Sequence, residues 1–398
     1  MKPLDGIRVL DLSRVLSGPH AGRLLADLGA DVIKLEPPEG DLTRHAHPRR
    51  NGISLYFTQQ NCGKRNVSVD LRAPEGTRIG LELAAACDVV LENYRPGVLD
   101  RLGCGYAAVR ERNPRVVWCS ITGWGSGGPE SGRRAYAPVV HAEAGFMDLA
   151  ARERGTEPVS EAVSHGDVYT GVHACNAILA ALLRRERAGT GDRVEVSMAE
   201  VLLFANEWSA SDLAGGDGGR PQAFGGAKAP VVRLADGTFA CVPGDPVITF
   251  PAFARSMGRE DLLDDERFSD PPARQRHRAE LAALISDWAS GIADFEAFEA
   301  ALEPNRLAAG IVRSAAEAAR LEWAQARGAV AAVDDRGGGT VELVRVPLVF
   351  DGADAGPSGV AAHQGEHNAD VLTELLGIDT DDIDRLTHAG VLVRKLPA

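Results

Sequence analysis

The first half of the chain alternates between short apolar runs and longer amphipathic runs. Segments such as IRVLDLS (7–13) and DVIKLE (31–36) have the length and apolar content of buried strands, and the segments between them have helical periodicity. This alternation predicts an α/β fold with a mostly parallel sheet covered by helices, and ligands in such sheets bind at the carboxyl ends of the strands. The expected strands are 7–13, 31–36, 88–94, 115–122 and 193–198, and the expected helices are 18–30, 74–87, 106–114, 168–187 and 199–213.

The chain has 398 residues, more than one ordinary hydrophobic core holds, so two domains are expected. The Gly- and Pro-rich stretch 215–230 is typical of a linker or loop. After it, RLADGTFACV predicts a short strand pair that turns at Asp236-Gly237, followed by several helices. We therefore expect a large domain over 1–214, a linker and smaller α+β domain over 215–330, and a return to the large domain over 331–398.

Composition limits the classes of partner. The net charge of −13 argues against broad binding to nucleic acid or anionic membranes, although a local basic pocket remains compatible with it. No apolar run approaches the roughly 18 residues of a membrane span, and the N-terminus lacks the features of a signal peptide, so a cytoplasmic protein is expected. The six cysteines are far apart and form no CxxC pair, which predicts buried reduced thiols and neither a metal site nor a disulfide framework.

A glycine-rich segment follows the expected strand at 115–122. Gly123, Gly125 and Gly128 have the spacing of a dinucleotide-binding loop. That loop requires a helix directly after its last glycine, but here Pro129 follows, without helical periodicity. Nicotinamide binding is therefore not expected. Two interpretations stay open, an ordinary wide turn or a loop that approaches another ligand closely.

Asp167 directly precedes a long apolar helical segment. It is a good candidate for the N-cap of that helix, where the helix end favours the carboxylate anion by about 0.3–1 kcal/mol. A carboxylate held in this way can also attack a thioester when water is excluded. His165 is either its acid/base partner or a partly exposed loop residue. The segment by itself does not distinguish capping from catalysis.

Several polar and cationic residues follow other strand ends of the expected sheet. An acidic protein that gathers cations at one sheet edge has what a phosphate-bearing cofactor needs. Turn formation is the alternative role for Asn93 and Arg95. The candidates are Lys64, Arg65, Arg72, Asn93, Tyr94, Arg95, Arg101 and Arg134.

Six sequence blocks in order resemble the class III coenzyme A (CoA) transferase family, also called CaiB/BaiF, which includes formyl-CoA:oxalate CoA-transferases and 2-methylacyl-CoA racemases. They extend over nearly the whole chain. The blocks are PLDGIRVLDLSRVLSGPHAGRLLADLGADVIKLEPPEGD, LYFTQQNCGKRNVSVDL, ENYRPGVLDRLG, GWGSGGP, GDVYTGVHACNAILAALLRRERAGTGDRVEVSM and GEHNADVLTELLG.

The resemblance implies a Rossmann-like large domain built from both chain ends, a smaller central domain and a homodimer of interlocked rings. It implies that Asp167 attacks an acyl-CoA to form a mixed anhydride and then an aspartyl-CoA thioester, from which a carboxylic acid takes the CoA. Acyl-CoA is then a substrate, and no bound cofactor is implied. Tyr136 matches an active-site tyrosine, and Gly225-Gly226 resembles a shielding loop. The implied CoA contacts are Val15, Ser17, Arg72, Asn93, Tyr94, Arg101, Arg134 and Met198.

Other positions depart from the family pattern. Leu16 replaces a glutamine common in formyl-CoA enzymes, Pro37 replaces a basic residue, and Ala137 replaces an acidic one. A racemase would need a second acid/base group on the other face of the α-carbon, for which Asp245 is a candidate, or else Asp245 caps a helix. Transferase is the first hypothesis, racemase the second, and a CoA-binding protein without turnover the third.

Overall fold

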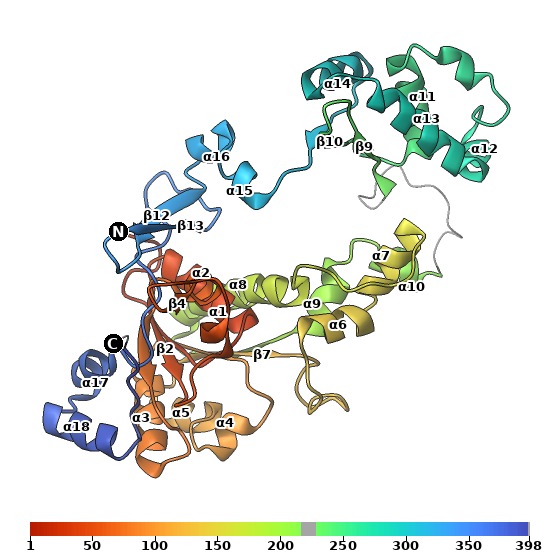
Figure 1. The fold of residues 1–398 in the computed structure, drawn as a ribbon. Coiled ribbons are helices and arrows are strands. Elements are labelled where there is room, and N and C mark those ends of the chain that lie inside the picture. The colour runs from red at the N-terminus through yellow and green to blue at the C-terminus, as the bar shows by residue number, and fades with distance from the viewer. Residues whose placement is uncertain (216–227, 397–398) are drawn as a thin grey trace. The chain divides into compact units, whose positions relative to one another are not determined.

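The computed structural model describes residues 1–215 and 228–396, and these fall into two units. The first unit comprises Met1–Phe146, Ser160–Asn206 and Glu322–Ala398, and the second comprises Met147–Val159 and Glu207–Leu321. The large unit is thus assembled from both ends of the chain, and most of the small unit comes from the part of the sequence between them (Figure 1).

A six-stranded, fully parallel sheet forms the centre of the large unit. Its order, β5-β2-β1-β6-β7-β8, follows the 3-2-1-4-5-6 pattern of dinucleotide-binding α/β folds when the six strands are numbered along the chain. The predicted α/β fold with a parallel sheet is confirmed. The strands are β1 (Arg8–Asp11), β2 (Asp31–Glu36), β5 (Arg65–Ser68), β6 (Val89–Glu92), β7 (Val117–Thr122) and β8 (Arg193–Ser197).

Helices cover both faces of this sheet, because successive strand residues point to opposite sides and both sets are apolar. Val9 packs with α1 (Ser17–Asp27) and α8 (His165–Ala188) on one face. Leu10 packs on the other face with α3 (Pro74–Ala85), α5 (Tyr106–Arg112), α17 (Asn368–Leu376) and α18 (Thr380–His388). The remaining helices and strands of this unit are α2 (Leu55–Asn61), α4 (Val98–Arg101), α6 (Ala137–Glu143), α9 (Met198–Ala205), α16 (Glu322–Ala326), β3 (Arg49–Arg50), β4 (Ile53–Ser54), β12 (Val330–Asp334) and β13 (Thr340–Val344).

The small unit has its own core, in which four phenylalanines, Phe250, Phe253, Phe268 and Phe298, are fully buried. Its antiparallel sheet has the order β11-β10-β9, and the predicted hairpin turns at Gly237. The strands are β9 (Val231–Arg233), β10 (Phe239–Cys241) and β11 (Gly310–Ile311), and the helices are α10 (Ser209–Leu213), α11 (Pro246–Ser256), α12 (Pro271–Arg276), α13 (Arg278–Ser290), α14 (Phe295–Leu302) and α15 (Ala315–Ala318), with α7 (Phe146–Arg154) from the earlier segment.

Several helix ends differ from the prediction by two or three residues, and one predicted helix is divided into two. The helix expected over 168–187 begins one turn earlier, at His165. The single helix expected over 199–213 is wrong, because Asn206 takes an extended backbone conformation and ends α9 before α10 begins. Apolar periodicity continues through this break, so the sequence pattern alone did not reveal it.

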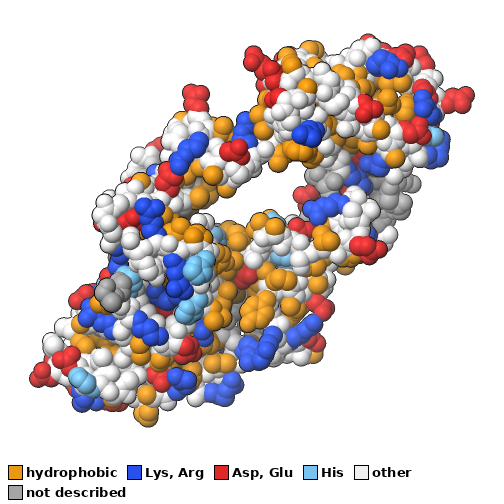
Figure 2. Space-filling model, in the orientation of Figure 1, with side chains coloured by type: hydrophobic (Ala, Val, Ile, Leu, Met, Phe, Trp, Pro, Cys, Tyr) orange, Lys and Arg blue, Asp and Glu red, His pale blue; other side chains and the backbone are white. Residues whose placement is uncertain are grey.

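The surface carries charges of both signs. Acidic and basic side chains are interspersed on the face drawn in Figure 2, unlike the continuous basic face of a nucleic-acid-binding surface. Among the described residues, none of the helices combines the length and apolarity needed to cross a membrane.

All six cysteines are free thiols, and five of them are buried. Burial raises the pKa of Cys62 and Cys87 to about 12 and that of Cys104 and Cys175 to about 11. The pKa of Cys119, in the centre of the sheet, is raised as well. These thiols therefore stay protonated at neutral pH, as expected of structural cysteines.

A buried ion pair joins β1 to the segment before β5. Lys64 Nζ lies 2.8 Å from Asp11 Oδ2, and both side chains are at most 1% exposed. Lys64 also donates to the Pro19 carbonyl (2.9 Å) and to Asn61 Oδ1 (3.0 Å). Burial lowers the pKa of Lys64 to about 8, even though Asp11 opposes that shift.

A second set of buried charges lies beside the loop that follows β1. Lys34 Nζ donates to the Ser13 carbonyl (2.8 Å) and lies 3.3 Å from Asp41. Burial disfavours the Asp41 anion, but the charge of Lys34 and the hydrogen bonds from Thr43 bring its pKa down to about 2. Glu36 pairs with Arg44 at 2.7 Å. The loop after β1 is therefore fixed by charges that are satisfied inside the protein.

Replacing Lys64 with methionine is expected to lower the free energy of unfolding by about 3–5 kcal/mol, because it leaves the Asp11 carboxylate buried without its partner. Urea denaturation measures this loss. Arg78→Ala breaks an exposed pair with Glu82 and should change the same quantity by less than about 1 kcal/mol. Equal effects of the two substitutions would contradict the role of the buried pair.

Candidate functional site

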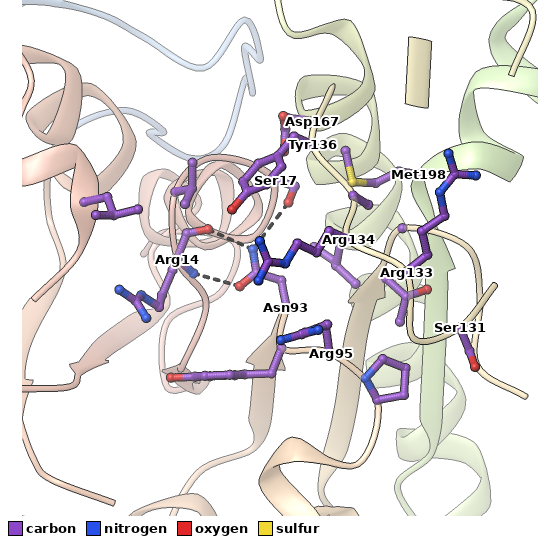
Figure 3. A pocket seen from close by; sticks show the side chains of 18 residues that line it. Arg14, Ser17, Asn93, Arg95, Ser131, Arg133, Arg134, Tyr136, Asp167 and Met198 are labelled. Carbon is purple, nitrogen blue, oxygen red and sulfur yellow. Dashed lines mark hydrogen bonds between the residues drawn. The ribbon is translucent and has the colours of Figure 1, made fainter. Parts of the chain in front are cut away.

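The site lies where the direction of strand order reverses in the sheet. β1 and β6 are neighbours, and the connections that follow them lead to opposite faces, which opens a crevice at their carboxyl ends. Asn93, the first residue after β6, joins the two loops. Its Oδ1 accepts from the Arg14 N–H (2.8 Å), and its Nδ2 donates to the Arg14 carbonyl (2.8 Å), as Figure 3 shows.

Val15 has a left-handed backbone conformation with φ of +70°, which is unfavourable for a β-branched residue. Such strain costs about 1–3 kcal/mol and needs support from the surroundings. Asp41 supplies it by accepting a hydrogen bond from the Val15 N–H (3.1 Å). The strained turn brings Val15 to the wall of the cavity described below.

Asp167 lies in the first turn of α8. The prediction that it caps this helix is wrong, since Ser164 occupies the N-cap position and the helix begins at His165. Gly171, one turn further along, lets α8 approach α1 closely, because a Cβ there would lie 2.7 Å from the Ser17 carbonyl oxygen. This close packing brings Asp167 next to Ser17 at the start of α1.

Burial raises the pKa of Asp167 to about 6, while the hydroxyl and backbone N–H of Ser17 lower it in part. The effect of the helix end, expected to favour the anion, is therefore outweighed by desolvation. The carboxylate is still mostly ionised at pH 7, and its partial burial removes part of its hydration. Both properties suit a nucleophile.

A cavity of about 520 Å³ contains Asp167 and extends along the crevice. Four arginines, Arg14, Arg95, Arg133 and Arg134, surround it together with Asp167 and Tyr136 (Figure 3). Other lining residues are Val15, Ser17, Leu42, Asn93, Tyr94, Pro96, Ile121, Thr122, Gly123, Ser131, Ala135 and Met198. Such a cavity suits a ligand with several phosphates at one end and a reactive carbonyl at the other.

The glycine-rich segment contributes Gly123 to this cavity. Gly125 has φ of +80° and donates its N–H to Thr122 Oγ1 (3.0 Å), which turns the chain sharply at the end of β7. The next helix of the segment, α6, begins only at Ala137. The loop therefore lacks the helix N-terminus of a dinucleotide-binding loop and instead lines the crevice.

The structure brings most of the predicted site residues together but not all of them. Arg72 is exposed and pairs with Asp70 (2.7 Å), and Arg101 is exposed in α4, so neither lines the cavity. Gly225 and Gly226 lie outside the described residues. The predicted residues that do line it are Asp167, Tyr136, Val15, Ser17, Asn93, Tyr94, Arg134 and Met198.

Two of the cations that were expected near a ligand pair with carboxylates of the protein instead. Lys64 is buried against Asp11, and Arg65 pairs with Asp31 and Glu374, each at 2.6 Å. Arg14 lines the cavity but was not among the predicted site residues. Its position just after the end of β1 could have indicated this role, because ligands bind at strand ends.

Tyr56 was also absent from the predicted site residues. Burial and then the charges of Asp167 and Asp41 raise the pKa of this half-exposed phenol, which places it within electrostatic range of the site. It belongs to α2, a short helix whose sequence carries no signal of a role at the site.

Asp245, the candidate second acid/base group, caps α11. Its Oδ1 accepts from the Val247 N–H (2.9 Å), and its Oδ2 accepts from Arg278 (2.8 Å). The carboxylate is almost fully buried. The capping alternative for Asp245 is therefore the one that the structure supports.

The sequence matches the model of CoA-transferase family III over residues 4–368. The chain belongs to CoA-transferase family III. This confirms the expected family and class of enzyme, and it agrees with a cavity that combines arginines and a reactive carboxylate.

Individual relatives align with nearly the whole length of this chain. It is 35% identical to a formyl-CoA:oxalate CoA-transferase of Streptomyces avermitilis, over 98% of this chain and 100% of that protein. It is 33% identical to a succinate–glutarate CoA-transferase of Agrobacterium fabrum, over 95% and 96% of the two. A CAIB/BAIF family protein from Brucella suis has a similar crystal structure, with a TM-score of 0.81 and 32% identity over 94% of this chain and 99% of that one.

The raised pKa of Asp167 predicts a pH-dependent effect of Asp167→Asn on stability. Between its ordinary pKa of 3.8 and its raised pKa of about 6, the folded enzyme binds more protons than the unfolded chain, so the carboxyl group costs stability above about pH 6. The variant should melt at a higher temperature than the natural enzyme near pH 8, and the difference should shrink as the pH falls through 6 towards about 4.

Calorimetry across this pH range measures the difference in Tm. The same substitution at the exposed Asp384 is the control for the general effect of replacing an aspartate with asparagine. A pH-independent effect at Asp167 would show that its carboxyl group is not desolvated.

Proposed function

We propose that the enzyme moves CoA from an acyl-CoA donor to a carboxylic acid through covalent intermediates on Asp167. The observation that carries the proposal is the position of one mostly ionised, partly buried carboxylate in a cavity lined by four arginines. Arg14, Arg95 and Arg134 can bind the phosphates of CoA, while Arg133 pairs with Glu143 at 2.6 Å. The thioester would then lie within reach of the carboxylate.

The reaction follows from this arrangement. The Asp167 carboxylate attacks the thioester carbonyl, forming an aspartyl–acyl anhydride and releasing the CoA thiolate. The thiolate attacks the Asp167 carbonyl of the anhydride, which gives an aspartyl-CoA thioester and frees the donor acid. The acceptor carboxylate then attacks this thioester, and the released thiolate takes the acceptor acyl group from the second anhydride. The aspartate is regenerated without a redox cofactor, since every step is an acyl transfer.

Two other side chains have roles in this proposal. Tyr136 is 58% exposed at the start of α6 and lines the cavity, where its hydroxyl can donate to an oxyanion of either tetrahedral intermediate. Ser17 lies beside Asp167 and stabilises the anion. The implied contacts of Val15, Asn93, Tyr94, Arg134 and Met198 with CoA belong to the same proposal, as do those of Arg72 and Arg101.

The acyl groups are proposed only as a class. The relatives named above transfer CoA between formate and oxalate or between succinate and glutarate, according to their names. Leu16, in place of the glutamine of formyl-CoA enzymes, supports a donor other than formyl-CoA. A racemase reaction has no comparable support, because the Asp245 carboxylate is engaged by a helix end and an arginine.

We also propose that the enzyme is a cytoplasmic homodimer of interlocked subunits. Large apolar side chains of α8 and α9, namely Tyr169, Val172, Leu183, Leu203 and Phe204, are exposed in the single chain. Covering them by a second subunit would remove apolar surface from water. Their exposure supports association but does not define how the subunits are linked.

Asp167→Ala is expected to reduce CoA transfer by at least about 1,000-fold, because it removes the nucleophile. Affinity for free CoA, measured by titration calorimetry, should stay close to that of the natural enzyme, since the arginines remain. The exposed-site variant Asp384→Ala is the control and should keep full activity.

The covalent route can be observed directly. The natural enzyme, incubated with an acyl-CoA and then with hydroxylamine, should yield a hydroxamate on the peptide that contains Asp167, detected by mass spectrometry. A racemase would instead exchange the α-proton of the acyl group with deuterated solvent, and a protein that only binds CoA would do neither. Wild-type turnover by Asp167→Ala would overturn the nucleophile assignment.

A further inference from the structure

His141 contacts the helix that carries Asp167. It is 1% exposed in α6, and its Nε2 accepts a hydrogen bond from the Gly166 N–H at 2.9 Å. Gly166 is the second residue of α8 and directly precedes Asp167. The first N–H groups of a helix have no partner within the helix, and the side chain of the N-cap residue Ser164 makes no capping hydrogen bond here. His141 thus supplies an acceptor that the helix does not provide for itself.

We propose that His141 is a positioning residue, whose unprotonated Nε2 fixes the first turn of α8 and thereby aims the Asp167 carboxylate into the cavity. The proposal rests on the proposed function of Asp167 as nucleophile. His141 itself is not among the residues that line the cavity, so it acts through the backbone of α8 and not by touching substrate.

The helix that carries His141 also joins two parts of the site. Tyr136 occupies the N-cap position of α6, and His141 lies one turn and a residue further along. The hydrogen bond from α8 to α6 therefore ties the segment of Asp167 to the segment of Tyr136. A nucleophile and an oxyanion donor must keep a fixed separation for both to act on one carbonyl group.

The surroundings of His141 favour its neutral form. Burial and then the charge of His165 lower its pKa, while Glu161 opposes that shift. The His165 ring centroid lies 6.0 Å away and that of Phe146 lies 5.4 Å away. From α9, apolar Met198 and Leu202 pack against α6, and no charged group of α9 contributes to the shift.

Protonation would convert Nε2 from an acceptor into a donor that faces the Gly166 N–H. The unfolded chain binds this proton below about pH 6.5, whereas the folded chain does so only at the lowered pKa. Stability is therefore lost as the pH falls from about 6.5 to that lower value. Asp167 also takes up a proton near pH 6, so the enzyme should lose activity in acid through two groups.

Two substitutions separate these effects. His141→Gln places an amide oxygen near the position of Nε2 and cannot be protonated, so kcat should stay within about threefold of the natural value at pH 7.5. His141→Leu removes the acceptor, and kcat should fall by about 10–100-fold while KM for acyl-CoA stays unchanged. Below pH 6, log kcat of the natural enzyme should fall more steeply with pH than log kcat of His141→Gln.

Ile178→Val is the matched control, because it loosens the buried core around α8 without removing a hydrogen bond. Its kcat should be unchanged at pH 7.5. The positioning role is overturned if His141→Leu keeps the natural kcat, or if Ile178→Val and His141→Leu lower it equally. Failure of the covalent route has a different signature, namely the absence of an Asp167 hydroxamate in the natural enzyme.

Discussion

Buried charge pairs beneath the crevice determine the shape of the site. Lys34 reaches the carbonyl group of Ser13 and the carboxylate of Asp41, and Asp41 in turn holds the strained Val15. A buried ion without a partner is far costlier than a paired one, so the loop has few alternative conformations. The same network excludes Lys34 and Asp41 from ligand binding, because their charges are already satisfied.

The order of the strands then determines where the cavity lies. Loops after β1 and β6 diverge, and the Asn93 side chain links them at the point of divergence. The third component, α8, packs against α1 through the small Gly171 and delivers Asp167 to the same point. The Asp167 carboxylate thus comes from a helix far along the chain, while the arginines of the cavity come from the loops that follow β1, β6 and β7.

Much of this arrangement was predictable from local patterns. Apolar runs at the lengths of buried strands predicted five of the six strands of the parallel sheet, all except β5, and the position of Asn93 after a strand predicted part of the cavity. It was harder to predict which cations pair inside the protein and which face a ligand. Lys64 and Arg65 pair with carboxylates that lie far away along the chain, so their partners could not be identified from the local sequence. The raised pKa of Asp167 likewise depends on tertiary packing, which outweighs the local preference of a helix end for an anion.

The protonated cysteines matter for an enzyme that handles thioesters. Thiol–thioester exchange requires a thiolate, and the raised pKa of Cys62, Cys87, Cys104, Cys119 and Cys175 keeps these groups in the thiol form. They are also at most 5% exposed, which limits the access of thioesters to them in the folded protein. These five buried thiols are thus poorly reactive towards the acyl-CoA that CoA-transferases use as substrate.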